Sequence, residues 1–470
     1  MERKALLLIA ATFLTTIVIG VFMMRYLSEH DKPVALFPAK KVVKQAKNSE
    51  VGIGWSTEGD PEKAVTEAVQ MARQGGDNRA PDLVIMFATS HSDMTGILRR
   101  ARELLGPDTK IYGGTSDSRA VMTSQGFVSA ARKGYDYQPD EPHRALAIMT
   151  IRSPLIKFGV GSTNCKEYSS PQEASIAATR KAIATADVQE SDHPRVVLLT
   201  APRGLEEETL EGIEEVLGKN TPILGGTAGG PVFQVFGQNE VYDVGVSLVA
   251  IYTDLPIGWC FEGGFDVWDK HAGIVTRVEG QEICEIDNRP ALDVYNEWLD
   301  GHIDRLYDQV GDIGKIRVLL TLHPIYRLFT SPSGQDYFLF SHPWPKDPTL
   351  SNRSVLTSNK IRPGEKIHIS HGQWETFLNR IGTLPAKARL DSDISPESRP
   401  LFSLGYICAG VMGVIPEAER EKMPFLINHM NDDVPFIAPI TWGEQGYFPG
   451  IGNKHGNLLT SFVVVGGRNK

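Results

Sequence analysis

A pattern of segments that occurs twice constrains the fold of this chain more than any other feature. Residues 111–118 read IYGGTSDS and residues 223–230 read ILGGTAGG, so an apolar pair followed by Gly-Gly-Thr recurs. Each stretch is preceded, in the same order, by a G-x-G segment, an Ala-rich helix, a proline-led apolar strand and a second helix. The sequence therefore predicts an internally duplicated α/β region.

Local signals place the elements of both copies. Asp60 and Ser170 can cap the Ala-rich helices, and Pro61 and Pro171 suit the first helical position. The strands are continuous apolar runs, which is typical of strands buried on both faces. They are VGIG (51–54), PDLVIMFATS (81–90) and RALAIMTI (144–151) in the first copy, and FGVG (158–161), PRVVLLTAPR (194–203) and VGVSLVAI (244–251) in the second.

A looser third copy lies near the C-terminus. We call the strand ends that begin with Gly-Gly-Thr, residues 113–118 and 225–230, the first and second corners. Residues 399–408 read RPLFSLGYIC, and residues 435–446 read PFIAPITWGEQG, whose TWGEQG part lies at the equivalent position and is the third corner. We expect a duplicated α/β domain over residues 50–255 and a C-terminal α/β domain over residues 256–466. Residues 302–350 look irregular and are interpreted as an insertion of unknown role.

The N-terminal segment has the composition of a membrane anchor. Residues 5–24 are uncharged and almost wholly apolar, which is enough to span a bilayer as a helix. No A-x-A site follows, so an uncleaved anchor over residues 1–27 is favoured over a cleaved signal peptide. Residues 28–49 are polar and read as a linker. We expect a single-pass protein of the cell membrane whose soluble part lies outside the cytoplasm.

Composition and motifs argue against several other functions. The formal net charge is −9 and no dense basic run is present, so nucleic acid is not an expected partner. The four cysteines are scattered, and the G-x-G segments do not complete a dinucleotide motif. His368 and His371 are three apart, which places them on opposite faces of a strand. We therefore expect no cofactor and no metal.

The sequence resembles the FIST family, a group of sensory modules. The resemblance runs over roughly residues 50–465 and is carried by VGIGWS, PDLVIMFATS, IYGGTSDS, ALDVYNEWLD (291–300), YICAG (406–410), TWGEQG (441–446) and KHGNLLT (454–460). The first corner departs from the family pattern at Ser116-Asp117-Ser118, and Gly456 separates His455 from Asn457. The resemblance implies a small ligand, with amino acids as the proposed class. Because we find no output segment such as a kinase, we expect an unidentified protein partner.

The candidate ligand-binding residues lie at the strand-end corners, where open α/β sheets usually bind ligands. Hydroxyl and backbone N–H groups there could hold a carboxylate, whereas Glu444 could accept hydrogen bonds from an ammonium group. As alternatives, the glycines only shape turns, the hydroxyls cap a following helix, and Glu444 is an exposed turn carboxylate. The candidates are Gly113, Gly114, Thr115, Ser116, Gly226, Thr227, Cys408, Trp442, Gly443, Glu444, His455 and Asn457.

Two further functions remain open from the sequence. Cys408 could be the nucleophile of a hydrolase or acyltransferase, if the fold brings His455 to it as a base and Glu444 as its orienting group. The alternative for this residue is a small buried side chain beside a pocket. A third possibility is a scaffold subunit of a membrane assembly, which would expose a large apolar patch.

Overall fold

The computed structural model describes residues 43–45 and 49–466, apart from residues 75, 77, 78, 90, 91, 119, 130–143, 190, 191, 312, 348, 391, 396 and 397. The chain divides into two compact units, Met1–Ala39 and Lys40–Lys470, and every described residue belongs to the second. The expected membrane helix at residues 5–24 lies outside the described residues. Within the described part, none of the helices has the length and apolar character needed to cross a bilayer.

Three sheets of the second unit share one strand order, to which the first sheet adds β1 at its edge. The first contains β1 (Val43–Gln45), β2 (Ser49–Ser56), β7 (Leu146–Arg152), β3 (Leu83–Thr89), β4 (Lys110–Ser116), β11 (Val235–Phe236) and β12 (Val241–Tyr242). The second contains β8 (Ile156–Asn164), β13 (Gly245–Thr253), β9 (Val196–Ala201), β10 (Ile223–Thr227), β25 (Glu444–Phe448) and β26 (Gly452–Gly456). The third contains β14 (Ile257–Glu262), β27 (Thr460–Val465), β23 (Phe402–Cys408), β24 (Phe436–Thr441), β5 (Ala120–Thr123) and β6 (Gly126–Ser129).

The sheet of the third copy, which the sequence predicts only loosely, thus has the same strand order as the sheets of the first two. In each sheet the first strand of the copy pairs with its last strand, and the second and third strands run parallel. The third strand of each copy then pairs with a hairpin from another copy: β4 with β11, β10 with β25, and β24 with β5. The three copies are therefore interlocked by a closed cycle of exchanged hairpins.

Helices cover the outer faces of the sheets, and the G-x-G segments explain how closely they approach. The Asp60 and Ser170 side chains accept hydrogen bonds at the starts of α2 (Pro61–Arg73) and α4 (Pro171–Thr185), as the sequence predicts. A Cβ atom on Gly54 or Gly161 would lie 1.8 Å from a carbonyl oxygen of α2 or α4, respectively. The glycines of these segments therefore serve helix–strand packing.

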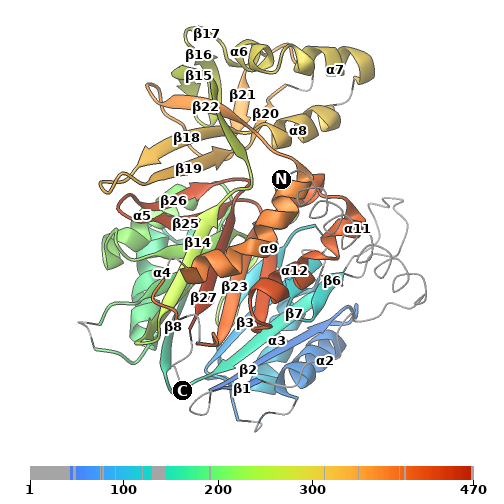
Figure 1. The fold of residues 1–470 in the computed structure, drawn as a ribbon. Coiled ribbons are helices and arrows are strands. Elements are labelled where there is room, and N and C mark those ends of the chain that lie inside the picture. Colours follow the sequence, from blue (N-terminus) through green and yellow to red (C-terminus); the bar gives the residue numbers. More distant parts are fainter. Residues whose placement is uncertain are drawn as a thin grey trace, which may run out of the picture. The chain divides into compact units, whose positions relative to one another are not determined.

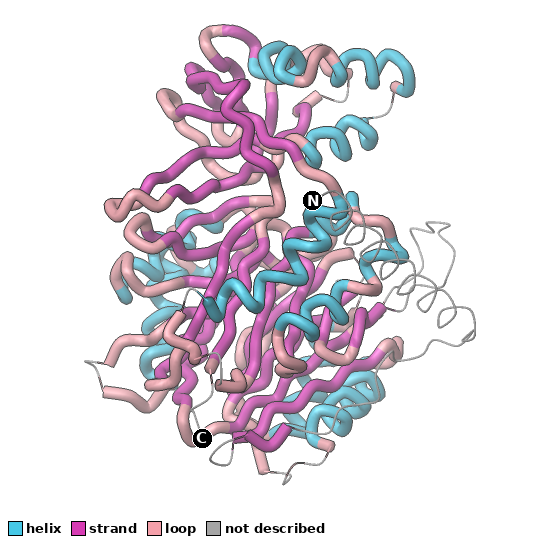
Figure 2. Tube along the Cα trace, in the orientation of Figure 1, coloured by secondary structure: helices cyan, strands magenta, loops and turns pink. Residues whose placement is uncertain are grey.

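The remaining helices of the three copies follow the same arrangement. Apolar residues of all three sheets, including Phe87, Leu198 and Leu404, form one central core. Figure 2 shows the strands gathered inside and the helices along their outer sides. These helices are α3 (Met94–Leu105), α5 (Glu206–Leu217), α9 (Trp374–Leu390), α10 (Ala409–Val414), α11 (Glu417–Arg420) and α12 (Met423–Met430), with the short 3₁₀ turn η2 (Cys165–Glu167).

An inserted region separates the first and second strands of the third copy (Figure 1). The interpretation of residues 302–350 as irregular is wrong. This stretch forms helices, and its strands belong to a further sheet. Its strands are β15 (Asp266–Glu279), β16 (Glu282–Ile286), β17 (Arg289–Pro290), β18 (Ile325–Thr330), β19 (Asp336–Ser341), β20 (Pro343–Pro345), β21 (Val355–Thr357) and β22 (Lys366–His371). Its helices are α6 (Ala291–Trp298), α7 (His302–Val310) and α8 (Ile313–Leu322).

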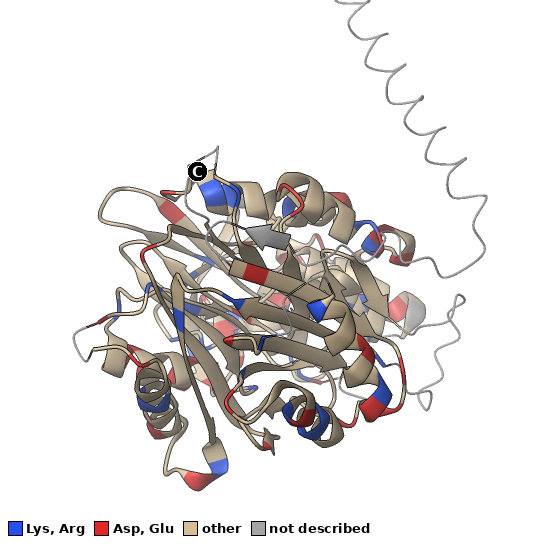
Figure 3. Cartoon of the chain, turned by 90° about the horizontal axis from the view of Figure 1, so that it is seen from below, with Lys and Arg blue, Asp and Glu red and all other residues tan. Residues whose placement is uncertain are grey.

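Charged residues are mixed in sign over the described part of the chain. Figure 3 shows lysine and arginine interspersed with aspartate and glutamate along the peripheral helices and loops. On α3, for example, Arg99 forms ion pairs with Glu62 of α2 and with Glu103. Such exposed pairs contribute little to stability.

Candidate functional site

The three strand-end corners meet one another through backbone hydrogen bonds. The Thr227 N–H donates to the Gly443 carbonyl over 2.8 Å, and the Gly229 N–H donates to the Thr115 carbonyl over 2.8 Å. The Asp117 N–H completes the set by donating to the Ile440 carbonyl, also over 2.8 Å. Each copy therefore contributes one corner to this hydrogen-bonded junction. The corner recurs in the sequence because each copy supplies the same strand end to the junction.

The hydroxyl groups of the first corner bind neighbouring backbone. The Ser116 hydroxyl donates to the Ala120 carbonyl over 2.6 Å and accepts from the Ile440 N–H over 2.8 Å, whereas Thr115 Oγ1 donates to the Gln234 carbonyl. The alternative that these hydroxyls cap a following helix is wrong. Strands β5 and β11, and not helices, follow the first and second corners.

The predicted glycines lie where neighbouring chain segments leave no room for a side chain. A Cβ atom on Gly113 would lie 1.7 Å from the Met86 carbonyl oxygen, and one on Gly226 would lie 2.4 Å from the Thr441 side chain. Gly114 similarly lies against the backbone that leads into β11. These glycines allow the corners to approach each other, and their role in ligand binding stays a prediction.

A buried polar cluster lies beside the second corner, where α5 begins. Glu206 is the first residue of this helix and only 2% exposed, and its Oε1 accepts a hydrogen bond from Thr227 Oγ1 over 2.9 Å. Burial raises the pKa of Glu206, although the nearby His455 opposes this shift. Gln445 and His455 are cross-strand partners on the hairpin β25–β26, with Gln445 Nε2 and His455 Nδ1 3.1 Å apart.

The loop before β25 packs directly on this cluster. A Cβ atom on Gly443 would lie 2.6 Å from His455 Cε1 and 3.0 Å from Asn457 Nδ2, and the φ angle of Gly443 is +142°. The fold therefore brings together four of the candidate residues, namely Thr227, Gly443, His455 and Asn457. They belong to the second and third copies.

Sequence reasoning missed Glu206, Glu207 and Gln445, which belong to the same cluster. Three consecutive glutamates at the start of a predicted helix, directly after the apolar strand of the second copy, were the available signal. Acidic residues in a first turn usually complement the helix dipole, so this signal is ambiguous without the fold.

Several buried polar atoms of the cluster have no hydrogen-bond partner among the described residues. They are Glu206 Oε2, Glu207 Oε2, Gln445 Oε1, His455 Nε2 and Asn457 Oδ1. Leaving a polar group buried without a partner costs about 1–3 kcal/mol. Four of the five are oxygen atoms, so the cluster offers mainly hydrogen-bond acceptors.

An exposed aromatic and cationic group lies next to the cluster in sequence and in space. Trp442, 39% exposed, packs edge-on against Phe233 with ring centroids 5.3 Å apart. The exposed Arg203 guanidinium lies 4.5 Å from the Trp442 ring centroid and 4.7 Å from that of Phe233. The Trp442 indole N–H donates to Asp117, whose carboxylate also accepts from the Gly230 N–H over 2.9 Å.

Glu444 and Cys408 form a separate, buried pair. The Glu444 carboxyl accepts from Thr441 Oγ1 over 2.8 Å and from the Leu459 N–H over 3.3 Å. The alternative of an exposed turn carboxylate is therefore wrong. Burial raises the pKa of Glu444 and, together with the Glu444 charge, raises the pKa of the Cys408 thiol well above the usual range.

His455 contacts Gln445 and is not part of the Glu444–Cys408 pair. Neighbouring residues of a strand face opposite sides, so the Gln445 side chain, which contacts His455, points away from the Glu444 side. Cys408 Sγ accepts a hydrogen bond from the Leu458 N–H over 3.2 Å. A neutral buried thiol is a poor nucleophile, so this geometry does not favour the catalytic role of Cys408.

Comparison with known proteins supports part of the resemblance. The family model of the FIST N domain matches residues 82–289, which include the first two corners and Glu206. A corresponding C-terminal match is not shown, and no curated protein matches the chain.

Two solved structures show weak similarity. A cyanuric acid hydrolase from A. caulinodans is 9% identical to this chain, with a TM-score of 0.31. The alignment covers 89% of this chain and 99% of the hydrolase chain. A chain of the PurLQS structure from Thermotoga maritima is 10% identical, with a TM-score of 0.22. The alignment covers 90% of this chain and 73% of that chain. Neither likeness is close enough to support a functional conclusion.

Proposed function

We propose that this chain is a sensory protein that binds a small polar metabolite with the chemistry of an amino acid at the interlocked corners. The unpartnered, buried acceptor atoms at the meeting point of the second and third copies carry this proposal. The match to the FIST N domain, which the resemblance links to small-ligand sensing, supports it independently.

The two ends of an amino acid find complementary groups in this part of the molecule. Asn457 Oδ1 is a buried, unpartnered acceptor that suits an N–H donor of an ammonium group. Arg203 is an exposed cation at the aromatic rim formed with Trp442 and Phe233, and it suits a carboxylate. An amino acid spanning these groups would contact the N-terminal and C-terminal halves of the chain at once.

The signal would pass from this junction to a protein partner. A ligand held by residues of two copies stabilises the exchanged hairpin β25–β26 against α5, and a partner could detect that change. The apolar residues 5–24 place the protein at the cell membrane in this proposal, with the soluble part outside the cytoplasm.

A thermal-shift screen of the full-length chain in detergent tests the proposed ligand class. Amino acids and small carboxylates are added singly, and a ligand at one hundred times its dissociation constant adds about 2.7 kcal/mol of stability. We expect a hit that Asn457→Ala and Arg203→Gln weaken. Arg180→Gln, which alters an exposed arginine of α4, is the matched control and should leave the hit unchanged.

A folded protein that responds to no compound would contradict the proposal and would favour the scaffold function. The Cys408-dependent hydrolase or acyltransferase is less well supported, since the thiol is buried and its pKa is raised.

A further inference from the structure

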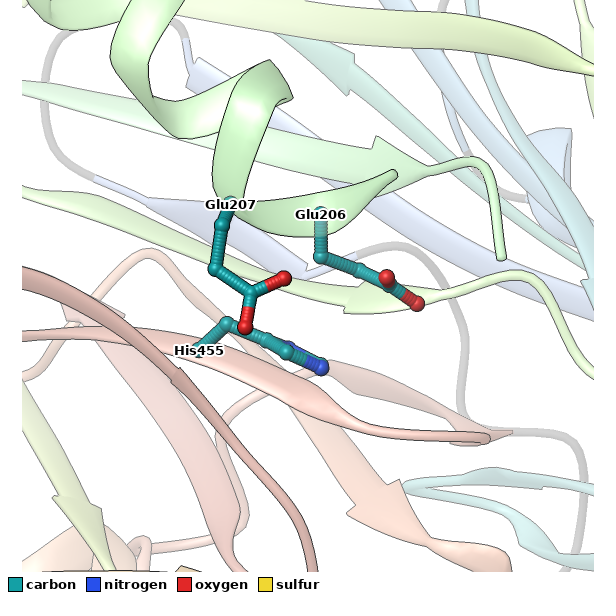
Figure 4. A group of neighbouring side chains, drawn as sticks. All are labelled: Glu206, Glu207 and His455. Atoms are coloured by element: carbon teal, nitrogen blue, oxygen red, sulfur yellow. The ribbon is translucent and has the colours of Figure 1, made fainter. Parts of the chain in front are cut away.

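Three metal-ligating side chains converge where α5 begins beside the hairpin β25–β26. We propose that Glu206, Glu207 and His455 bind a divalent transition-metal ion, with zinc as the probe. The glutamates are the first two residues of α5 and His455 lies on β26, so the site joins the second and third copies (Figure 4). Such a site needs only atoms of this chain and does not depend on the proposed metabolite.

The distances suit an ion held by all three side chains. One ligand atom from each of Glu206, Glu207 and His455 lies within 4.8 Å of the other two. Zinc bonds of about 2.0–2.2 Å in a tetrahedral site separate the ligand atoms by roughly 3.5 Å. Figure 4 shows the Glu206 and Glu207 side chains extending from α5 on the side where His455 lies, and side-chain rotation would bring the three ligand atoms from within 4.8 Å of one another to that spacing.

Each carboxylate has one oxygen fixed by the protein and one without a partner. Glu206 Oε1 accepts from Thr227 Oγ1 over 2.9 Å, and Glu207 Oε1 accepts from the Lys360 N–H over 2.8 Å. Both Oε2 atoms are buried and unpartnered among the described residues. Metal-binding carboxylates are commonly oriented by such outer hydrogen bonds.

His455 has the same division between a fixed and an unpartnered atom. Its Nδ1 lies 3.1 Å from the amide of Gln445, and its buried Nε2 has no partner among the described residues. The oxygen and nitrogen of a glutamine amide are assigned by their partners, and Gln445 Oε1 has none. Turning this amide over gives up the 3.3 Å hydrogen bond from Gln445 Nε2 to Thr227 Oγ1. In exchange, His455 Nδ1–H donates to Gln445 Oε1, which leaves the Nε2 lone pair for a metal.

Helix-dipole complementarity alone does not explain this arrangement. Acidic residues in the first turn of α5 favour the positive helix end by about 0.3–1 kcal/mol each when exposed. That effect requires neither the burial of Glu206 nor the convergence of two carboxylates on an imidazole. A bound dication would balance the negative charge of the two carboxylates.

The ligand set indicates the class of ion. Two carboxylate oxygens and one imidazole nitrogen suit zinc, manganese or iron, whereas calcium prefers six or more oxygen ligands. Among these ions zinc binds nitrogen and oxygen sites most tightly. Three protein ligands leave a coordination position for a water molecule or for a bound metabolite.

Zinc binding to the full-length chain in detergent tests the site. The chain is stripped with a chelator and titrated with Zn²⁺ against a coloured indicator, and the bound zinc is counted by elemental analysis. We expect one zinc ion per chain, and about a tenfold or greater loss of affinity in Glu207→Gln and in His455→Gln. Glu211→Gln, an exposed glutamate farther along α5, should bind zinc as the wild type does.

A measurement on the wild type keeps the test decisive if a variant fails to fold. X-ray absorption of the zinc-loaded chain should report nitrogen and oxygen neighbours only. Sulfur neighbours, the absence of stoichiometric zinc, or unchanged affinity in both folded variants would overturn the site. Repeating the amino-acid screen in excess chelator separates the two proposals, because a persisting hit supports the metabolite site whatever the zinc result.

Discussion

At the scale of single residues, β25 divides adjacent side chains between two buried environments. Glu444 faces Cys408 and Thr441, whereas Gln445 faces Thr227 and His455. The sequence could predict that this corner is important but not which residue points where, because both faces of the strand are buried and no polar alternation marks them. The sequence therefore indicates Glu444 as a candidate residue but gives no sign that its neighbour Gln445 belongs to the polar cluster.

The buried Glu444 carboxyl predicts a pH-dependent stability. Its pKa in the folded state is raised by burial, so the folded chain keeps a proton that the unfolded chain releases above about pH 4.3. The stabilising contribution is complete below that pH and is lost as pH rises toward the folded-state pKa. We expect Glu444→Gln to fold and to show a shallower fall in the free energy of unfolding over this range.

Urea denaturation at a series of pH values measures the effect. Glu211→Gln changes an exposed glutamate and should keep the wild-type pH dependence. If Glu444→Gln and the wild type show equal slopes, the carboxyl is ionised in the folded state and the reasoning is wrong.

At the scale of elements, local signals were sufficient for the helices and the buried strands, but not for their partners. Caps at Asp60 and Ser170 and continuous apolar runs identify α2, α4, β3 and β9 because these signals act within a few residues. Strand β25 pairs with β10, more than two hundred residues earlier in the chain, and no short-range pattern specifies that choice. The sequence therefore does not predict the exchange of hairpins between the copies.

Asn453 ties the exchanged hairpin to the second copy and provides a test of that exchange. Its Oδ1 accepts from the Ile223 N–H over 2.8 Å, and its Nδ2 donates to the Thr221 carbonyl over 3.1 Å and to Glu214 over 3.0 Å. Asn453→Ala leaves a buried N–H group unpaired, so we expect a loss of about 1–3 kcal/mol in the free energy of unfolding.

Chemical denaturation followed by circular dichroism checks this value. Asn220→Ala alters an exposed asparagine just before β10 and should change stability by less than about 0.5 kcal/mol. Equal effects of the two substitutions would show that the hairpin contributes nothing specific to the second copy.

At the scale of the whole molecule, the third copy is the feature that the sequence only partly revealed. The inserted sheet separates β14 from β23, so the spacing that identifies the first two copies is lost in the third. The same separation hid the cluster, since Glu206 and His455 meet only when the third copy returns its hairpin to the second. The anchor at residues 5–24 and the domain boundary near residue 255 stay predictions.

The closed cycle of hairpins predicts that the two halves of the chain cannot fold apart. A fragment of residues 45–255 lacks β25, which covers the edge of β10, and lacks β24, which pairs with β5. It also exposes the part of the central core that packs against Leu404 and Ile437. We expect this fragment to bind a hydrophobic dye and to lack a near-ultraviolet dichroism signal, as a chain without fixed packing does.

The full-length chain, measured in the same detergent, is the reference. It should show little dye binding and one cooperative transition, because every copy contributes to a shared core. A fragment that unfolds cooperatively on its own would mean that the boundary near residue 255 separates autonomous domains. The interlocked hairpins would then be docking contacts between two finished folds and not part of a single folding unit.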